Sequence, residues 1–278
     1  MILPSGTKLD FSGPVLVMAI INCNDDSFYP ASRSKTPDAA EKALEAQQDG
    51  AAIVDFGGES SRPGSAYIST EEELERVIPA IKAFRKQSAL PVSVDTRKAV
   101  VARSALDAGA DIINDISALY DDPEMAPLCA RCGAPVILVH MKGTPVNMQN
   151  SPVYTDVLKE VRDFLQNAAD RAMESGIQKE KIILDPGFGF GKNTNDNLTL
   201  LARLAEIGLS GYPLMAGVSR KSFIGEITGR PVNERLAGTL AASAAAIWGG
   251  ASIIRLHDVK EGADLANILY AIKKRKTV

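Results

Sequence analysis

The chain has 278 residues, of which 45% are hydrophobic and 23% charged, close to the averages of globular proteins. This composition excludes a disordered chain, a collagen and a small disulfide-rich scaffold. The net charge of −3 gives no overall positive field, so neither nucleic acid nor an anionic membrane is an expected partner. The three cysteines argue against a secreted disulfide framework, and no targeting segment is visible, so a cytoplasmic protein is expected.

Eight short β-branched runs recur along the chain, most of them followed by turn residues and a longer amphipathic stretch. The predicted strands are residues 15–21, 52–56, 92–95, 112–114, 136–140, 182–185, 214–217 and 253–255. Helix-like segments between them include residues 37–49, 70–86, 98–108, 157–175, 196–207 and 232–248. Gly50, Gly109 and Gly176 are predicted to end helices just before the next strand. The pattern predicts an α/β protein, a single (β/α)₈ TIM barrel over residues 1–278 with a short amino-terminal extension at about 1–13.

One apolar stretch needs a separate interpretation. Residues 236–254 are uncharged over nineteen positions, about the length of a membrane-spanning helix. Ala, Gly, Ser and Thr dominate the stretch, and Gly249 and Gly250 divide it. We therefore expect a buried helix followed by a buried strand.

Polar residues stand at the carboxyl end of every predicted strand, which is where barrels of this type build their active sites. They are Asn22, Asp55, Asp95, Asn114, His140, Asp185, the run Ser219, Arg220 and Lys221, and Arg255 with His257. One such residue means little because strand ends meet water, but eight of eight predict a polar site. For His140 alone, a structural hydrogen-bonding role is an equal alternative.

Two kinds of ligand suit these side chains. Asp95, Asn114 and Asp185 offer acceptors and donors for the edge of a planar nitrogen heterocycle, where a carboxylate can pair with two N–H groups. A second set suits an anion such as phosphate, because Arg presents a rigid fork and the Asn22 oxygen can complete a Mg²⁺ shell that phosphates mostly fill. This second set is Asn22, Arg62, Arg255 and His257.

Two other motifs predict less. Cys129 and Cys132 form half of a zinc motif, so two cysteines on a helix face are expected rather than a redox pair or a metal held wholly by protein. Residues 187–192 (GFGFGK) fail the phosphate-binding loop pattern. They predict a flexible main chain close to a ligand, with Phe188 and Phe190 available to stack on a ring.

Seven motifs, in order over nearly the whole chain, resemble those of the dihydropteroate synthase family. They are residues 55–64 (DFGGESSRPG), 93–98 (SVDTRK), 113–115 (IND), 140–145 (HMKGTP), 185–192 (DPGFGFGK), 219–223 (SRKSF) and 254–259 (IRLHDV). The resemblance implies a transferase that joins 6-hydroxymethyl-7,8-dihydropterin diphosphate to 4-aminobenzoate, giving 7,8-dihydropteroate and diphosphate in folate biosynthesis. It also implies Mg²⁺ as cofactor and a homodimer.

The resemblance assigns roles to individual residues. Those implied for the pterin are Asp95, Asn114, Asp185 and Lys221. Those implied for the diphosphate are Asn22, Arg62, Arg255 and His257, with Mg²⁺ between Asn22 and the phosphates. Those implied for the aminobenzoate are Ser61, Arg62, Pro63, Phe190, Arg220, Lys221 and Ser222. Catalysis is expected to depend on Asp95, Lys221, Arg255 and His257. Arg255, His257 and Mg²⁺ would neutralise the departing diphosphate, and Asp95 with Asp185 would shelter a pterin cation.

One segment departs from the family pattern. The family usually has Asn-x-Thr-Pro-Asp-Ser-Phe after the first strand, whereas residues 22–28 here read NCNDDSF. Asn24 and Asp25 therefore replace Thr and Pro, which removes a restriction on φ and adds a negative charge near the expected diphosphate.

Two other functions remain open from the sequence. A corrinoid-dependent methyltetrahydrofolate methyltransferase would use a similar barrel, but it would not need the motif at residues 219–222 or the pair Arg255 and His257. A catalytically silent pterin-binding barrel is favoured only by the altered segment at residues 22–28. Diphosphate release on addition of aminobenzoate separates the synthase from both.

Overall fold

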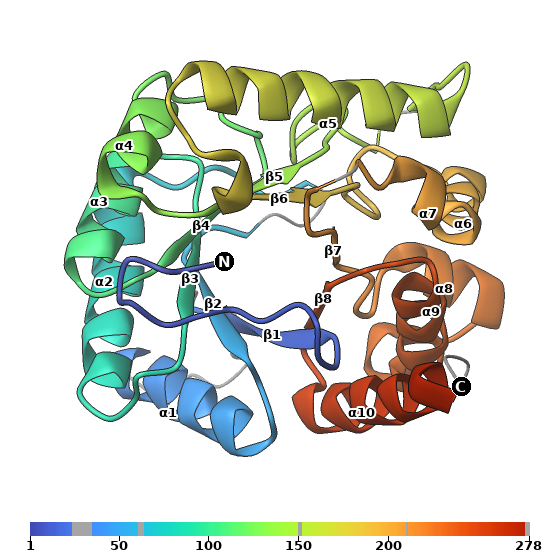
Figure 1. Cartoon of the computed structure of the whole chain (residues 1–278), viewed down its shortest axis with the longest axis horizontal. Helices are drawn as coiled ribbons and strands as arrows, with labels where there is room; N and C mark the ends of the chain where they lie inside the picture. Colours follow the sequence, from blue (N-terminus) through green and yellow to red (C-terminus); the bar gives the residue numbers. More distant parts are fainter. Residues whose placement is uncertain (24–34, 61–63, 150–151, 210, 276–278) are drawn as a thin grey trace.

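The computed structural model describes residues 1–23, 35–60, 64–149, 152–209 and 211–275, and it confirms the predicted barrel (Figure 1). The strands are parallel and follow the order β6-β5-β4-β3-β2-β1-β8-β7. A single parallel bridge between Leu184 and Leu214 joins the two outer strands and completes the ring. The strands are β1 (Leu16–Asn22), β2 (Ile53–Gly57), β3 (Val92–Asp95), β4 (Ile112–Asp115), β5 (Val136–Val139), β6 (Ile182–Asp185), β7 (Met215–Ala216) and β8 (Ile253–Leu256).

Helices surround the strands in Figure 1. They are α1 (Lys35–Gln48), α2 (Thr70–Arg85), α3 (Ala99–Asp107), α4 (Met125–Cys132), α5 (Val157–Glu174), α6 (Thr194–Ala202), α7 (Leu204–Ile207), α8 (Ser222–Thr228), α9 (Leu236–Trp248) and α10 (Val259–Arg275). Two predicted helices differ in detail. The segment at 196–207 divides at Arg203 into α6 and α7, and the segment at 232–248 begins with a separate 3-10 turn, Val232–Glu234, before α9.

Local sequence signals explain where several helices begin and end. The Ser69 hydroxyl caps α2 by accepting a hydrogen bond from the Glu72 amide at 3.1 Å. Gly50, Gly109 and Gly176 have φ of +100°, +106° and +94°, a region that favours glycine, and each stands between a helix and the next strand as predicted. In the described part of the chain, no helix combines the length and apolarity that crossing a membrane requires.

The strands are buried on both faces, as expected for a parallel sheet covered by helices. One core lies between the strands and the helices and includes Phe56, Phe84 and Phe188. A second core fills the barrel interior, and its members are Leu3, Leu9, Met18, Ile53, Ile112, Ile137, Val139, Ile183, Met215 and Ile253. Most of the strand residues in this second core lie near the amino ends of their strands, so the apolar filling occupies that end of the barrel.

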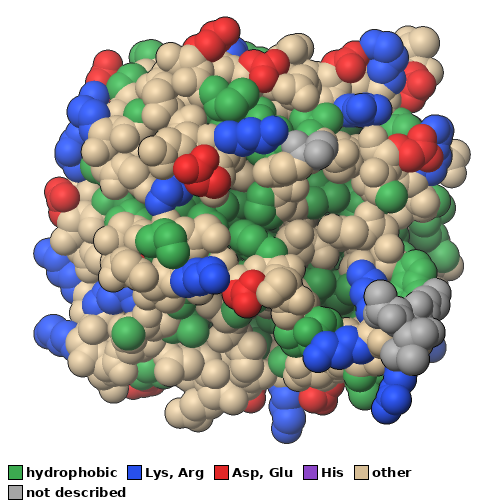
Figure 2. Space-filling view, viewed as in Figure 1, with side chains coloured by type: hydrophobic (Ala, Val, Ile, Leu, Met, Phe, Trp, Pro, Cys, Tyr) green, Lys and Arg blue, Asp and Glu red, His purple; other side chains and the backbone are tan. Residues whose placement is uncertain are grey.

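The amino-terminal extension closes the same end. Ile2 and Lys8 form an antiparallel bridge, and Leu3 and Leu9 are buried in the interior core. The segment runs across the ring of strands in Figure 1. The face seen in Figure 2 has hydrophobic side chains toward its centre and charged side chains of both signs around its edge. The site is therefore formed by the loops at the carboxyl ends of the strands.

Candidate active site

Side-chain alternation carries polar groups into the barrel directly above the apolar filling. Along each strand every second residue faces the interior. Four strands place a polar residue two positions after an interior isoleucine: Asp55 after Ile53, Asn114 after Ile112, Asp185 after Ile183 and Arg255 after Ile253. These four strand-end residues therefore point inward together rather than into the helical layer.

A compact group, the Arg255 cluster, consists of Asp55, Asp95, Asn114 and Arg255. Arg255 Nε donates to Asp55 Oδ2 at 2.7 Å, and Arg255 Nη2 donates to Asp95 Oδ2 at 2.9 Å. Asn114 Nδ2 donates to the same Asp55 oxygen at 3.0 Å. The structure thus unites one residue predicted for the diphosphate, Arg255, with two predicted for the pterin, Asp95 and Asn114.

The charges of this cluster influence one another strongly. Burial raises the pKa of Asp95 to about 7, although Arg255 stabilises its anion, and the nearby Asp55 carboxylate adds to the rise. Burial opposes the charge of Arg255, but Asp55 and Asp95 outweigh it and raise the pKa of the guanidinium. Asp95 therefore changes its protonation state near neutral pH while Arg255 stays charged.

Asp185 and Lys221 form the adjoining part of the site. A Cβ atom built on Gly217 would lie 3.9 Å from Asp185 Oδ2 and 4.0 Å from Arg255 Cβ, so this glycine separates Asp185 from the Arg255 cluster. Burial raises the pKa of Asp185 to about 6, opposed by the Gly187 amide that donates to Oδ1 at 2.7 Å and by Lys221. Burial, together with Arg255, lowers the pKa of Lys221 to about 8.

Phe190 and Lys221 lie together, as the sequence predicted for the aminobenzoate side. Lys221 Nζ is 4.1 Å from the centroid of the Phe190 ring. Ser222 follows as the first residue of α8 and is exposed. These contacts bring one apolar ring and one cation to the border of the polar site.

Arg220 and His257 are each held by a neighbour. Arg220 makes two bonds to Asp258, Nε to Oδ2 at 3.0 Å and Nη2 to Oδ1 at 2.5 Å, and its φ of +53° is uncommon for a residue with a side chain. The His257 amide donates to Ser219 Oγ at 3.2 Å, and that oxygen lies 2.9 Å from His257 Nδ1. Ser219 Oγ therefore contacts both the main-chain amide and the imidazole of His257.

The other predicted residues lie at or beyond the edge of the described chain. Asn22 ends β1 with an exposed side chain. Ser61, Arg62 and Pro63, like the unusual residues Asn24 and Asp25, lie outside the described residues, so their roles remain predictions.

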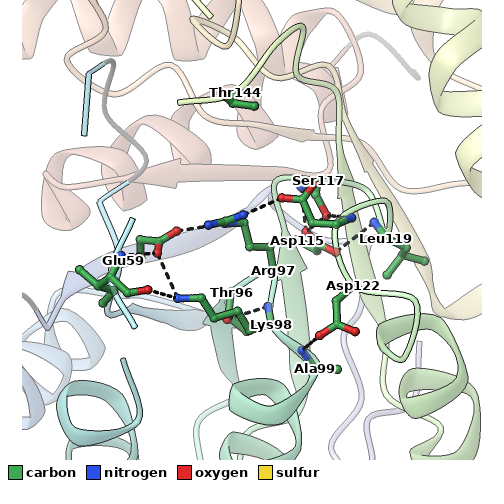
Figure 3. A network of polar contacts seen from close by, with 12 residues as sticks. Glu59, Thr96, Arg97, Lys98, Ala99, Asp115, Ser117, Leu119, Asp122 and Thr144 are labelled. Atoms are coloured by element: carbon green, nitrogen blue, oxygen red, sulfur yellow. Dashed lines mark hydrogen bonds and ion pairs between the residues drawn. The ribbon is translucent and has the colours of Figure 1, made fainter. Parts of the chain in front are cut away.

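The segments that flank residues 61–63 are anchored by a second polar network, drawn in Figure 3. Glu59 accepts from Arg97 Nε at 3.0 Å and from Lys98 Nζ at 3.1 Å. The Ile68 amide also donates to Glu59, at 3.0 Å. The loop after β2 is thereby attached to the loop after β3 on both sides of residues 61–63.

His140 has the structural hydrogen-bonding role that the sequence left open beside a role in the site. Lys192 Nζ lies 2.8 Å from His140 Nδ1, and it donates to the carbonyl oxygens of Gly187 at 2.8 Å and Phe190 at 3.0 Å. Burial and the Lys192 charge lower the pKa of His140 well below its usual value, so the imidazole is neutral. Sequence reasoning did not identify Lys192, although it ends the glycine-rich motif, and it assigned Asp55 no individual role.

The prediction for the glycine-rich segment is wrong for Phe188. Phe188 is fully buried in the core between strands and helices, so it cannot stack on a ligand. The glycines allow close packing of the main chain. A Cβ on Gly187 would lie 1.9 Å from the His140 carbonyl oxygen, and one on Gly191 would lie 2.2 Å from the Lys142 carbonyl oxygen. Only glycine allows the β6 loop to pack this closely on the β5 loop.

The helix predicted around the two spaced cysteines is confirmed. Cys129 and Cys132 both belong to α4, where Cys129 is buried and Cys132 is exposed, and both are free thiols.

Comparisons with known proteins agree with this geometry. The family described as "Pterin binding enzyme" matches residues 18–257. A dihydropteroate synthase of Synechocystis sp. is 45% identical over 273 residues, which are 97% of this chain and 94% of that protein. The structure of Yersinia pestis dihydropteroate synthase with a sulfonamide drug is similar with a TM-score of 0.92 and 42% identity, covering 97% of this chain and 98% of that one. Xanthomonas albilineans dihydropteroate synthase in complex with 7,8-dihydropteroate is similar with a TM-score of 0.87 and 40% identity, covering 95% of each chain. The chain belongs to the pterin-binding enzymes and, among them, to the dihydropteroate synthase family.

Proposed function

We propose that this chain transfers the pterin-methyl group of 6-hydroxymethyl-7,8-dihydropterin diphosphate to the amine of 4-aminobenzoate, giving 7,8-dihydropteroate and diphosphate. The observation that carries this proposal is the direct contact of Arg255, a cation suited to diphosphate, with Asp95, a carboxylate suited to the pterin. The similarity to the Xanthomonas albilineans enzyme in complex with 7,8-dihydropteroate supports it.

Asp185 and Lys221 suit the two sides of the pterin ring. Asp185 is buried, and as an anion it can accept two N–H bonds from the amidine-like edge of the pterin. Lys221 can donate to the carbonyl side, while Asp95 and Asn114 can reach the remaining ring nitrogens. Because these groups are already desolvated, a ligand that supplies complementary donors and acceptors gains more than it would in water.

Departure of the diphosphate requires positive charge. When the carbon–oxygen bond breaks, its electron pair leaves with the diphosphate, and a resonance-stabilised cation remains on the dihydropterin. Arg255 and His257 would neutralise the departing group together with Arg62, while the Asp95 and Asp185 carboxylates would shelter the cation. The aminobenzoate amine then forms the carbon–nitrogen bond and releases a proton, so no nucleophilic side chain is needed.

The aminobenzoate would lie beside Phe190 and Lys221, whose contact supplies an apolar surface next to a cation. Arg220 and Ser222 border this region from the loop after β7 and the start of α8. Ser61, Arg62 and Pro63 would cover it from the loop after β2.

Mg²⁺ would be held by Asn22 and the substrate. A carboxamide oxygen is a hard ligand that suits Mg²⁺, and the exposed position of Asn22 at the end of β1 fits a site in which phosphate oxygens supply most of the ligands. When bound, the ion would supply positive charge to the diphosphate. EDTA is therefore expected to stop turnover and to leave the melting temperature of the ligand-free protein unchanged. A clear fall in that melting temperature would contradict this arrangement.

A cytoplasmic homodimer is part of the same proposal. The exposed side chains of Trp248, Ile268 and Ile272 on α9 and α10 supply apolar surface that a second copy could cover. Light scattering coupled to size-exclusion chromatography should give twice the mass of 29.6 kDa. A monomer at micromolar concentration would contradict it.

The reaction itself is tested by diphosphate release. The purified protein, given the pterin diphosphate, is expected to release diphosphate only when 4-aminobenzoate is added, with 7,8-dihydropteroate forming in equal amount. Methyl transfer from methyltetrahydrofolate to a corrinoid protein would instead indicate the methyltransferase. Pterin binding without either reaction would indicate a catalytically silent barrel.

A further inference from the structure

Asp55 is the most deeply buried member of the Arg255 cluster. Asp55 is completely buried in the middle of β2. Gly57, two residues further along the strand, pairs with Asp95. The Asp55 side chain is 0% exposed, whereas the side chains of Arg255 and Asp95 are 19% and 13% exposed. The surface open to a ligand is therefore supplied by Arg255 and Asp95 rather than by Asp55.

A single oxygen of Asp55 organises both sides of the site. Asp55 Oδ2 accepts from Arg255 Nε at 2.7 Å and from Asn114 Nδ2 at 3.0 Å. Charge-assisted bonds of this kind are short and directional. They anchor the Arg255 Nε and the Asn114 amide nitrogen on the same carboxylate oxygen.

The arrangement leaves two other buried acceptor atoms of the cluster without hydrogen bonds to the described residues. Asp55 Oδ1 and Asn114 Oδ1 are both buried, and neither has a hydrogen-bond partner among the described residues. Leaving such atoms unpaired opposes folding. The unpaired atoms are tolerated in an arrangement that holds the Arg255 guanidinium and the Asn114 carboxamide on one anchor.

We propose that Asp55 is a positioning residue that touches no substrate and, through Oδ2, holds Arg255 for the diphosphate and Asn114 for the pterin. Arg255 pivots on its Nε bond to Asp55, so Nη2 can leave Asp95 and turn to the diphosphate without losing its anchor. Asp95 then loses its cation when the diphosphate arrives and becomes available to the pterin. Asp55 thus couples the two halves of one substrate. This inference rests on the proposed function for the identity of both ligands.

The test is Asp55→Asn, because asparagine keeps the shape but presents a neutral group to Arg255. We expect kcat/KM for the pterin diphosphate to fall roughly 30- to 100-fold, the size of effect that misplacement of a catalytic group can have. By calorimetry, the affinity for inorganic diphosphate and the affinity for 6-hydroxymethylpterin should both fall. The loss for diphosphate should equal or exceed the loss for the pterin. Wild-type kinetics and affinities in Asp55→Asn would overturn the proposal.

The double variant Asp55→Asn with Arg255→Ala separates positioning from direct contact. If Asp55 acts on the diphosphate only through Arg255, the double variant should bind inorganic diphosphate as weakly as Arg255→Ala alone, within about threefold. A further tenfold loss would mean that Asp55 acts on the diphosphate independently of Arg255, which overturns the proposal. This comparison also remains decisive if Asp55→Asn alone does not fold, because the double variant removes both charges of the pair.

The matched control is Asp111→Asn, which alters another buried aspartate paired with an arginine, at the opposite end of the barrel. It should lower the melting temperature and leave kcat/KM and both affinities unchanged. The binding measurements do not require turnover. Absence of diphosphate release in the wild-type protein would therefore refute the proposed function alone, whereas unchanged ligand affinities in Asp55→Asn would refute the role of Asp55 alone.

Discussion

Buried arginine–aspartate pairs stand at both ends of the barrel, and they are built differently. At the amino ends of the strands, Arg85 has one carboxylate partner among the described residues, Asp111, at 2.5 Å. The same guanidinium donates to the carbonyl oxygens of Gly109 at 2.7 Å and Leu90 at 2.5 Å, and Asp111 Oδ2 also accepts from the Val92 amide at 3.0 Å. One cation meets one anion, and backbone groups complete the arrangement.

At the carboxyl ends, Arg255 is shared by two carboxylates, Asp55 and Asp95, while Asn114 Oδ1 nearby has no partner among the described residues. Buried polar groups are usually satisfied, so unpaired ones mark either strain or a place for a ligand. The pKa of Asp95 is also displaced to about 7 by burial, a sign common at functional sites. The comparison teaches that the same pair of residue types stabilises one end of this barrel and keeps the other ready for a ligand.

The strongest way to break this comparison is Arg255→Ala. We expect kcat/KM for the pterin diphosphate to fall on the order of 10³-fold, because the main cation at the departing group is lost. Calorimetric affinity for a pterin without phosphates should change much less, and His257→Ala should act in the same direction with a smaller loss. Equal losses for the two ligands would remove Arg255 from the diphosphate site.

Asp111→Asn tests the other end. The free energy of unfolding should fall by about 2 kcal/mol, since a charge-assisted bond to Arg85 is lost. Urea titration measures this value, and steady-state kinetics at 25 °C should be unchanged. Asp55→Asn should lower the unfolding free energy less than Asp111→Asn, because Arg255 still has Asp95. A larger destabilisation by Asp55→Asn would show that both ends serve stability alike.

Asp185→Asn is a further test of the functional, carboxyl end of the barrel. One carboxylate oxygen becomes an N–H donor that faces a donor of the pterin, and the unpaired contact costs about 1–3 kcal/mol of binding free energy. Circular dichroism should show a folded chain, and calorimetry should show the weaker affinity. An affinity within twofold of the parent would exclude Asp185 from pterin recognition.

The smallest effect concerns pH and stability. The pKa of Asp95 is raised in the folded state, so the folded chain holds a proton that the unfolded chain has already lost. The stabilising contribution of this group is complete below its unfolded value and disappears as pH rises through about 7. The melting temperature of Asp95→Asn minus that of the parent should therefore become more positive between pH 5 and 8. A constant difference over this range would contradict the raised pKa.

The strands were predictable because each is a short β-branched run bounded by turn residues, and the polar strand ends were predictable because they interrupt that pattern. The partners of these residues were not. Arg255 and Asp55 are 200 positions apart, so no local pattern indicates their contact. His140 gave the same strand-end signal as Asp185, yet a lysine from the next loop turns it into a structural residue. Phe188 and Phe190 differ by two positions, and only the packing of the loop decides that Phe188 enters the core between strands and helices while Phe190 packs against the barrel interior.

The contact between the β5 and β6 loops also bears on how this enzyme can evolve. Gly187 and Gly191 admit no side chain, because any added carbon would collide with a carbonyl oxygen of the neighbouring loop. An inhibitor that binds against the main chain between them would meet a surface that point substitutions cannot reshape without separating two loops. Resistance to such a compound would have to arise elsewhere, whereas compounds that depend on side chains of exposed loops leave many single-codon routes of escape.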